Sequence, residues 1–186
     1  MRAVSGESDE RLFAAYVAGD VAAHEALFRR YQERLRRYLE RMLGERAAAE
    51  GVTIETFLRL HRHRRRFRAG TSVRAWIFTI GRNLARNRLR AQRLWGWFPL
   101  SSADAATTAP PPESTGEVRE RVAAAFAALP AVQREVCALR LVAGLSLEEI
   151  AATTGASIGT VKSRLFYGLR RLRALLGDLA PGGTSG

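Results

Sequence analysis

The stretch GASIGTVKSRLFYGLRR, from Gly155 to Arg171, combines hydroxyl, phenol and guanidinium side chains without one acidic residue to balance its cations. On a helix, its apolar positions gather on one side and its hydrogen-bond donors on the other. The apolar residues that we expect to face a core are Ile158, Val161, Leu165, Leu169, Leu172 and Leu176. The donors are Thr160, Ser163, Arg164, Tyr167, Arg170 and Arg171, with Lys162 on the flank. Such donors read base edges and grip phosphates, so the segment predicts a DNA contact rather than a solvated surface of mixed charge.

A second group of donors recurs at helical spacing in the first half of the chain. Arg82, Arg86 and Arg90 form a column at four-residue spacing, and Asn83 and Asn87 form the adjacent row. Like charges at this spacing cost about 0.2–0.5 kcal/mol per pair in an isolated helix. A column without local compensation therefore indicates a polyanionic ligand.

The block HRHRRRFRAG, just before that column, places cations beside Phe67. Cations next to a ring suit single-stranded nucleic acid, whose bases stack on aromatic side chains. The alternative is a solvated charged turn with Phe67 in the core. Both interpretations stay open at the level of sequence.

Residues with catalytic or metal-binding potential are few, namely His24, His61, His63 and Cys137. His61 and His63 are two residues apart and do not share a helix face, and a metal site needs at least a third ligand. Cys137 lies among apolar residues, as a core thiol does, and there is no Gly-rich phosphate loop with its lysine. We therefore expect no enzyme, no catalytic residue, no cofactor and no metal.

The net charge of the 186-residue chain is +12, from 30 basic and 18 acidic residues. Lys162 is the one lysine, and the segment 1–98 carries most of the excess charge. This balance favours a polyanionic partner but does not indicate a fold. One cysteine excludes an internal disulfide framework, and neither a signal peptide nor an apolar run of about 20 residues is present. We expect a soluble, cytoplasmic protein.

Apolar residues recur at helical spacing along most of the chain, and strand alternation is absent, so the expected fold class is all-α. In the first half we expect a bundle of helices at about 9–18, 20–43, 46–63 and 72–93. Asp20 and Ser72 have the side chains of N-caps, and Gly44 suits the end of the second helix.

The composition changes at Leu94, where LWGWFPLSSADAATTAPPPESTG is rich in proline, serine and threonine and lacks periodicity. Such a stretch is typical of a linker. Its rings, Trp95, Trp97 and Phe98, either cover the end of the bundle or dock on a partner.

Helical patterns resume after the linker. Ser114 and Glu117 have capping-box spacing, and Pro130 suits the first turn of the next helix, which Gly144 ends. The sequence SLEE, from Ser146, is a second capping box. A short helix, a turn at Gly155 and a longer helix capped by Ser157 together predict a helix-turn-helix. We therefore expect an N-terminal domain at 8–93, a linker at 94–116, a C-terminal domain at 117–177 and a tail at 178–186.

Two stretches resemble the DNA-binding domains of bacterial sigma factors. Residues 25–90, which end in RAWIFTIGRNLARNRLR, look like the N-terminal promoter-binding domain, and residues 128–176, which contain GTVKSRL, are similar to the C-terminal domain. Response regulators share the string GTVKSRL, but the upstream stretch separates the two families. With only these two domains and a short linker, the chain is identified as a member of the extracytoplasmic-function (ECF) sigma factors.

The resemblance implies a dissociable initiation subunit of RNA polymerase, in which the polymerase supplies the chemistry. The helix with Thr160, Lys162, Ser163, Arg164, Tyr167, Arg170 and Arg171 would read the −35 element in the major groove. The N-terminal domain would read the −10 element and capture bases of the melting strand. By position, that role falls to Gly70, Thr71, Ser72, Trp76, Arg82, Asn83, Arg86, Asn87 and Arg90. The implied partners are core RNA polymerase, promoter DNA (double-stranded at −35, partly single-stranded at −10) and an anti-sigma factor, in the bacterial cytoplasm.

The chain departs from the family in the helix that docks on core polymerase. It reads AEGVTIETF where relatives have a pattern like AEDLVQETF, so Gly51 and Ile54 replace an acid and an amide, while Glu55 and Phe57 are retained. We expect weaker docking or different contacts. A second departure is the Trp76-Ile77 pair, which replaces two tryptophans of housekeeping sigma factors and implies weaker melting and a narrow choice of promoters.

Two alternatives stay open beside the sigma factor. One is a sigma-like decoy that binds an anti-sigma protein without driving transcription, which Gly51 and Ile54 support. The other is a transcriptional regulator that uses the helix-turn-helix alone, although it leaves the arginine column and the linker unexplained.

Overall fold

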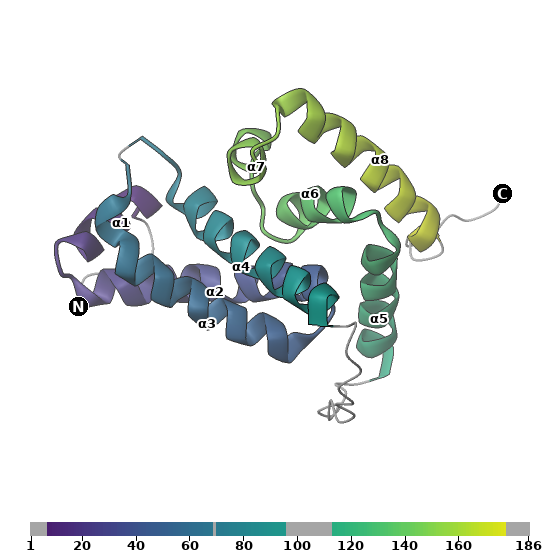
Figure 1. Ribbon diagram of the computed structural model, residues 1–186, viewed down its shortest axis with the longest axis horizontal. Helices are drawn as coiled ribbons and strands as arrows, with labels where there is room; N and C mark the ends of the chain where they lie inside the picture. Colours follow the sequence, from purple (N-terminus) through teal and green to yellow (C-terminus); the bar gives the residue numbers. More distant parts are fainter. Residues whose placement is uncertain (1–6, 69, 96–112, 178–186) are drawn as a thin grey trace.

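The computed structural model describes residues 7–68, 70–95 and 113–177, and within these ranges the secondary structure is helical (Figure 1). The N-terminal domain consists of α1 (Asp9–Val17), α2 (Val21–Leu43), α3 (Arg46–His63), the 3-10 turn η2 (Arg64–Arg66) and α4 (Val73–Trp95). The C-terminal domain consists of α5 (Glu113–Ala128), α6 (Ala131–Leu141), α7 (Leu147–Thr154) and α8 (Ile158–Leu176). The expected all-α fold class is confirmed.

Local side-chain chemistry begins and ends these helices where the sequence indicates. The Asp20 carboxylate accepts hydrogen bonds from the amides of Ala22 and Ala23, and Gly44 ends α2 in the left-handed conformation with φ of 78°. The Ser72 hydroxyl accepts from the Ala75 amide. The capping box of Ser146 and Glu149 is present at α7.

Three boundaries differ from the expectation. Helix α4 continues through Trp95, because nothing before Gly96 interrupts a helix, and α5 begins at Glu113, so both enter the stretch expected to be a linker. Pro130 precedes α6 as its N-cap rather than lying in its first turn. Trp97, Phe98 and the side chain of Trp95 lie outside the described residues, as do most of the linker and the tail.

Aromatic and leucine side chains fill the core of the N-terminal domain. Phe78 of α4 lies edge-on to Tyr31 and Tyr38 of α2, with ring centroids 6.5 and 5.6 Å away. Helix α4 approaches α2 so closely at Gly81 that a Cβ there would lie 2.9 Å from Leu35 Cδ1. Glycine at this position therefore sets the spacing of α2 and α4, and with it the position of the arginine column.

The core of the C-terminal domain lies between α6 and α8. A Cβ at Gly168 of α8 would overlap the Cys137 Sγ, so glycine allows the two helices to meet. Cys137 is fully buried, which confirms it as a core thiol, and burial raises its pKa to about 11. Ile158 and Leu169, expected to face the core, are exposed, because the apolar arc of α8 is wider than its neighbours cover.

The two domains pack directly against each other. Helix α4 contacts α7, and α2 contacts α6, so that α7, the first helix of the helix-turn-helix, lies beside the first turns of α4 (Figure 1). None of the described helices is long and apolar enough to cross a membrane.

Candidate nucleic-acid interface

Helix α8 presents the predicted donors on its outer side. The Ser157 hydroxyl caps the helix by accepting from the Thr160 amide, and Val161, Gly168 and Leu172 are buried. The exposed members of the predicted set are Lys162, Ser163, Tyr167, Arg170 and Arg171, and the half-buried ones are Thr160 and Arg164. One helix face thus holds together the donors that the sequence predicts.

Contacts on α8 hold some of these side chains in place. The Arg170 guanidinium lies 5.5 Å from the ring centroid of Tyr167, and Arg171 donates to Gln133 Oε1 at 3.1 Å. Phe166 is exposed and lies edge-on to Tyr167, with ring centroids 5.4 Å apart. Phe166 is not among the residues predicted from the sequence, although its place beside Tyr167 on α8 is a usable signal.

The arginine column of α4 is not uniformly free. Arg86 and Arg90 are exposed, but Arg82 is only 8% exposed and pairs with Glu135 of α6, which is 6% exposed. Arg82 Nε donates to Oε1 at 2.8 Å, and a terminal nitrogen donates to Oε2 at 3.2 Å. The expectation of a column without compensation is therefore wrong at Arg82, because the compensating acid lies in the other domain. Asn83 and Asn87 are exposed.

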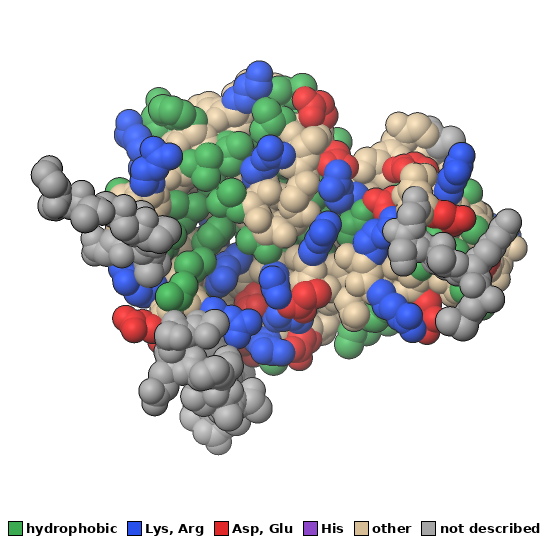
Figure 2. Space-filling model, turned by 180° about the vertical axis from the view of Figure 1, so that it is seen from behind, with side chains coloured by type: hydrophobic (Ala, Val, Ile, Leu, Met, Phe, Trp, Pro, Cys, Tyr) green, Lys and Arg blue, Asp and Glu red, His purple; other side chains and the backbone are tan. Residues whose placement is uncertain are grey.

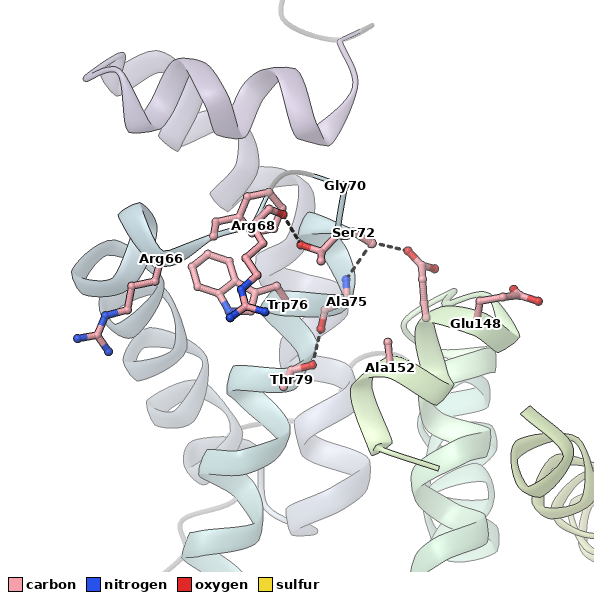
Figure 3. A pocket seen from close by; sticks show the side chains of 12 residues that line it. Arg66, Arg68, Gly70, Ser72, Ala75, Trp76, Thr79, Glu148 and Ala152 are labelled. Carbon is pink, nitrogen blue, oxygen red and sulfur yellow. Dashed lines mark hydrogen bonds between the residues drawn. The ribbon is translucent and has the colours of Figure 1, made fainter. Parts of the chain in front are cut away.

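The loop before α4 borders a cavity of about 570 Å³ (Figure 3). Gly70 takes φ of 86°, which favours glycine, and the Thr71 hydroxyl donates to the Arg68 carbonyl at 2.7 Å. Ser72 lies at the cavity edge and donates to Glu149 of α7 at 2.6 Å. Trp76 of α4 also lines the cavity. The predicted loop residues and Trp76 thus converge on one hollow, which the C-terminal domain closes on its other side.

Phe67 packs against other rings and also lines the cavity. Its ring packs against Phe13 and Trp76, with centroids 4.7 and 5.3 Å away, as in a core. It also lines the same cavity as Trp76. The aromatic wall of the cavity is therefore held by packing from behind.

A second cleft, of about 550 Å³, separates α4 from the helix-turn-helix. Its cationic and hydroxyl lining comes from both domains and consists of Arg82, Arg86, Arg90, Arg93, Thr154, Thr160 and Arg164. The residues predicted for the −10 and −35 elements therefore meet across one narrow space.

The predicted polymerase-docking helix, α3, exposes an apolar pair. Ile54 and Leu58, one turn apart, are 59% and 48% exposed. Gly51 is also exposed, and Glu55 pairs with Arg59 at 2.8 Å. Leu58 was missed, although its position four residues after Ile54 placed it on the same helix face.

Phe57 does not belong to the exposed face of α3. It is 6% exposed and packs against Phe28 of α2, with ring centroids 4.8 Å apart. Its expected part in docking is therefore wrong as a direct contact, because the side chain lies on the core side of the helix. Phe57 fixes the position of α3 instead.

Two of the histidines, His24 and His61, pack with Tyr16 in an aromatic cluster. The Tyr16 hydroxyl hydrogen-bonds to His61 Nδ1 at 2.7 Å, and the Tyr16 ring stacks on His24 at 4.6 Å. Burial and the nearby His61 lower the pKa of His24. The described ranges contain no group of three or more His, Cys, Asp or Glu residues that could hold a metal ion.

The surface differs between the two domains. On the face seen in Figure 2, charged side chains lie on both halves, and hydrophobic ones gather on the half that holds the C-terminal domain. Exposed apolar residues of the C-terminal domain include Phe166, Leu169 and Leu175.

Comparisons with known proteins agree with this arrangement. The family model for sigma-70 region 2 matches residues 27–94, and the model for sigma-70 region 4 matches residues 125–174. The RNA polymerase sigma factor CarQ of Myxococcus xanthus is 38% identical over 159 residues, which cover 84% of this chain and 91% of CarQ. The ECF RNA polymerase sigma factor SigL of Mycobacterium tuberculosis is 35% identical over 172 residues, covering 89% and 97%.

Solved structures of sigma factors share the fold. The structure of CnrH in complex with the cytosolic domain of CnrY gives a TM-score of 0.71 at 26% identity, covering 92% of this chain and 99% of that one. The sigma factor RpoE in complex with the anti-sigma factor NepR from Bartonella quintana gives 0.69 at 25% identity, covering 82% and 96%. The two regions in one chain, their order and these relatives lead to one conclusion: the chain belongs to the extracytoplasmic-function RNA polymerase sigma factors.

Proposed function

We propose that this sigma factor directs core RNA polymerase to promoters through the donor face of α8 and the loop cavity before α4. The observation that carries the proposal is the pairing of these two surfaces in one chain: a helix of unbalanced donors and a hollow lined by rings and hydroxyls. A helix-turn-helix regulator needs the first surface and leaves the second without a role.

The face of α8 suits the −35 duplex. Arginine and lysine side chains bind phosphates or guanine edges, and hydroxyls accept or donate to either. Lys162 on the flank lies where a phosphate contact is expected, and Arg164, near the beginning of the helix, lies where recognition helices contact base edges. The remaining contacts in this proposal are Thr160, Ser163, Tyr167, Arg170 and Arg171.

The loop cavity suits one extruded base of the −10 strand. Trp76 and Phe67 supply a stacking surface, and Gly70, Thr71 and Ser72 supply the backbone and hydroxyl groups of the rim. Extrusion costs a few kcal/mol of lost stacking, which such a pocket offsets. The exposed Arg86, Arg90, Asn83 and Asn87 would follow the strand from there, together with Arg82 when it is released from Glu135.

Docking on core polymerase is assigned to the exposed face of α3. Ile54 and Leu58 offer apolar area where related chains carry an amide, and Glu55 offers a charge beside it. An anti-sigma partner is part of the proposal, because the similar structure of RpoE from Bartonella quintana is that of a sigma factor in complex with the anti-sigma factor NepR. The chain would work in the bacterial cytoplasm and supply no catalytic group of its own.

The test is binding of the purified chain to core RNA polymerase, followed by run-off transcription from a selected promoter library. Tight binding with promoter-specific transcripts is the expected result. Absence of binding that Gly51→Asp with Ile54→Gln restores would overturn the proposal in favour of the decoy. Specific binding to duplex DNA without polymerase, combined with no transcription, would favour a simple regulator.

A further inference from the structure

Two carboxylates of the C-terminal domain are bound by the N-terminal groups that we assign to the −10 strand. Glu135 of α6 accepts both hydrogen bonds from Arg82, at 2.8 and 3.2 Å. Glu149 of α7 accepts from the Ser72 hydroxyl at 2.6 Å and from Arg74 Nε at 3.0 Å. A carboxylate offers oxygen acceptors to arginine in the same way that a phosphate does.

The Arg82–Glu135 pair is deep inside the contact between the domains. Both side chains are nearly inaccessible, so neither meets solvent while the domains remain together. Removing one partner of such a pair leaves an uncompensated buried charge, which is strongly destabilising. The pair therefore makes this packing of the domains depend on both residues.

The contact around Glu149 is a network rather than a single bond. Its second oxygen accepts from the Ser146 amide within the α7 capping box. Arg74 also donates to the Gly144 carbonyl at 3.2 Å, and the Thr153 hydroxyl donates to the Ala75 carbonyl at 3.4 Å. Helix α7 thus fixes the loop and the first turn of α4 at several points (Figure 3).

We propose that Glu135 and Glu149 act as an intramolecular stand-in for the −10 strand, and hold the free chain in a closed form that does not bind that strand. The inference rests on the proposed function, because it takes Arg82 and Ser72 as −10 contacts. In the closed form both of these side chains are occupied by carboxylates, and α7 engages the cavity rim. Binding of the −10 strand then requires separation of the two domains, and each carboxylate competes with the DNA for the same donors.

The first experiment measures domain separation in the full chain, without DNA or polymerase. Cysteines replace the exposed Ala47 of α3 and Ala174 of α8 and carry spin labels, while the buried Cys137, with its raised pKa, stays unlabelled. We expect one narrow distance distribution for the parent chain and a longer, broad one for Glu135→Gln with Glu149→Gln. The matched control is Glu148→Gln, an exposed neighbour that points away from the loop (Figure 3).

The second experiment links opening to strand binding. Anisotropy of a labelled, mixed-sequence single strand of about 12 nucleotides reports affinity. If the closed form dominates by about ten to one, opening raises the apparent affinity about tenfold, because only the open fraction binds. Arg82→Glu alone is expected to lengthen the label distance, and the charge swap Arg82→Glu with Glu135→Arg is expected to shorten it again. The swap should not restore affinity for the strand, because position 82 then carries a carboxylate.

Three results would overturn the inference. They are a parent chain that is already open, a double glutamine variant that stays closed, and a variant that opens without gaining affinity for the strand. The label distances do not depend on promoter recognition. A closed chain that opens as expected but supports no promoter-specific transcription with polymerase would therefore count against the proposed function alone.

Discussion

The contact between Gly168 and Cys137 gives a prediction about stability that can be worked out atom by atom. A Cβ at Gly168 would overlap Cys137 Sγ and come within 3.5 Å of the Gln133 Cβ. Alanine is favoured over glycine inside a helix by about 0.5–1 kcal/mol, but overpacking costs about 1–3 kcal/mol. We therefore expect Gly168→Ala to lower the free energy of unfolding by about 1–2 kcal/mol, although it deletes no contact.

A double-mutant cycle with Cys137→Ala isolates the cause. Cys137→Ala removes the Sγ atom that obstructs the new Cβ. In that background, Gly168→Ala should therefore no longer destabilise the chain, and the helix preference of alanine over glycine should stabilise it. We expect a favourable coupling of about 1–3 kcal/mol between the two sites, measured by urea denaturation followed by far-ultraviolet circular dichroism. The control is Gly159→Ala on the same helix, where a Cβ would meet only the Ser157 Oγ at 3.9 Å. Additive effects in the cycle, or a Gly168→Ala chain as stable as the parent, would refute the reasoning.

Three further predictions follow from other contacts. The Tyr38 hydroxyl is buried and no hydrogen bond to it is found in the described structure, so Tyr38→Phe should leave stability unchanged or raise it by up to about 1 kcal/mol in thermal melts. Burial alone would raise the pKa of Glu149, but its hydrogen bonds from Ser72, the Ser146 amide and Arg74 outweigh burial and lower it. The ionised Glu149 therefore stabilises the closed form fully above its ordinary pKa of 4.5, and this stabilisation is lost as the pH falls through the lower pKa of the closed form. The distance between the two spin labels should accordingly lengthen only below about pH 4.5. Lys162→Ala should weaken duplex binding equally for all sequences and reduce the slope of log affinity against log salt concentration by about one. Arg164→Ala should instead reduce the binding free energy by about 1–3 kcal/mol and relax the sequence preference. An equal loss on all sequences for both variants would contradict this division.

Local features of the fold were predictable from the sequence, because they depend on neighbours along the chain. The cap at Asp20, the capping box at Ser146 and the turn at Gly155 each involve residues within a few positions of one another. The same local periodicity placed the donors of α8 on one face. The docking group that joins Phe57 to Ile54 came from the family pattern instead, and such a pattern does not tell an exposed position from a buried one.

The contacts between the domains were not predictable in this way. Arg82 and Glu135 are 53 residues apart, and Ser72 and Glu149 are 77 apart. Periodicity shows that a charge lies on an exposed helix face but not which other helix covers it. The arginine column therefore looked uniform in the sequence, and only the fold distinguishes the buried Arg82 from the exposed Arg86.

The hydroxyl of Ser72 has a consequence for the shape of the cavity rim. Its oxygen accepts from the Ala75 amide while its single proton goes to Glu149, so one side chain both begins α4 and bridges the domains. While that bridge exists, the loop is held in one conformation. The entropic cost of ordering the loop is then already met before a ligand binds. When Glu149 withdraws, the Ser72 hydroxyl is released to donate to a ligand at the edge of the cavity that Trp76 also lines. We expect the acidic residue that keeps DNA out to serve also as a template, which preorganises the receptor for the ligand that displaces it.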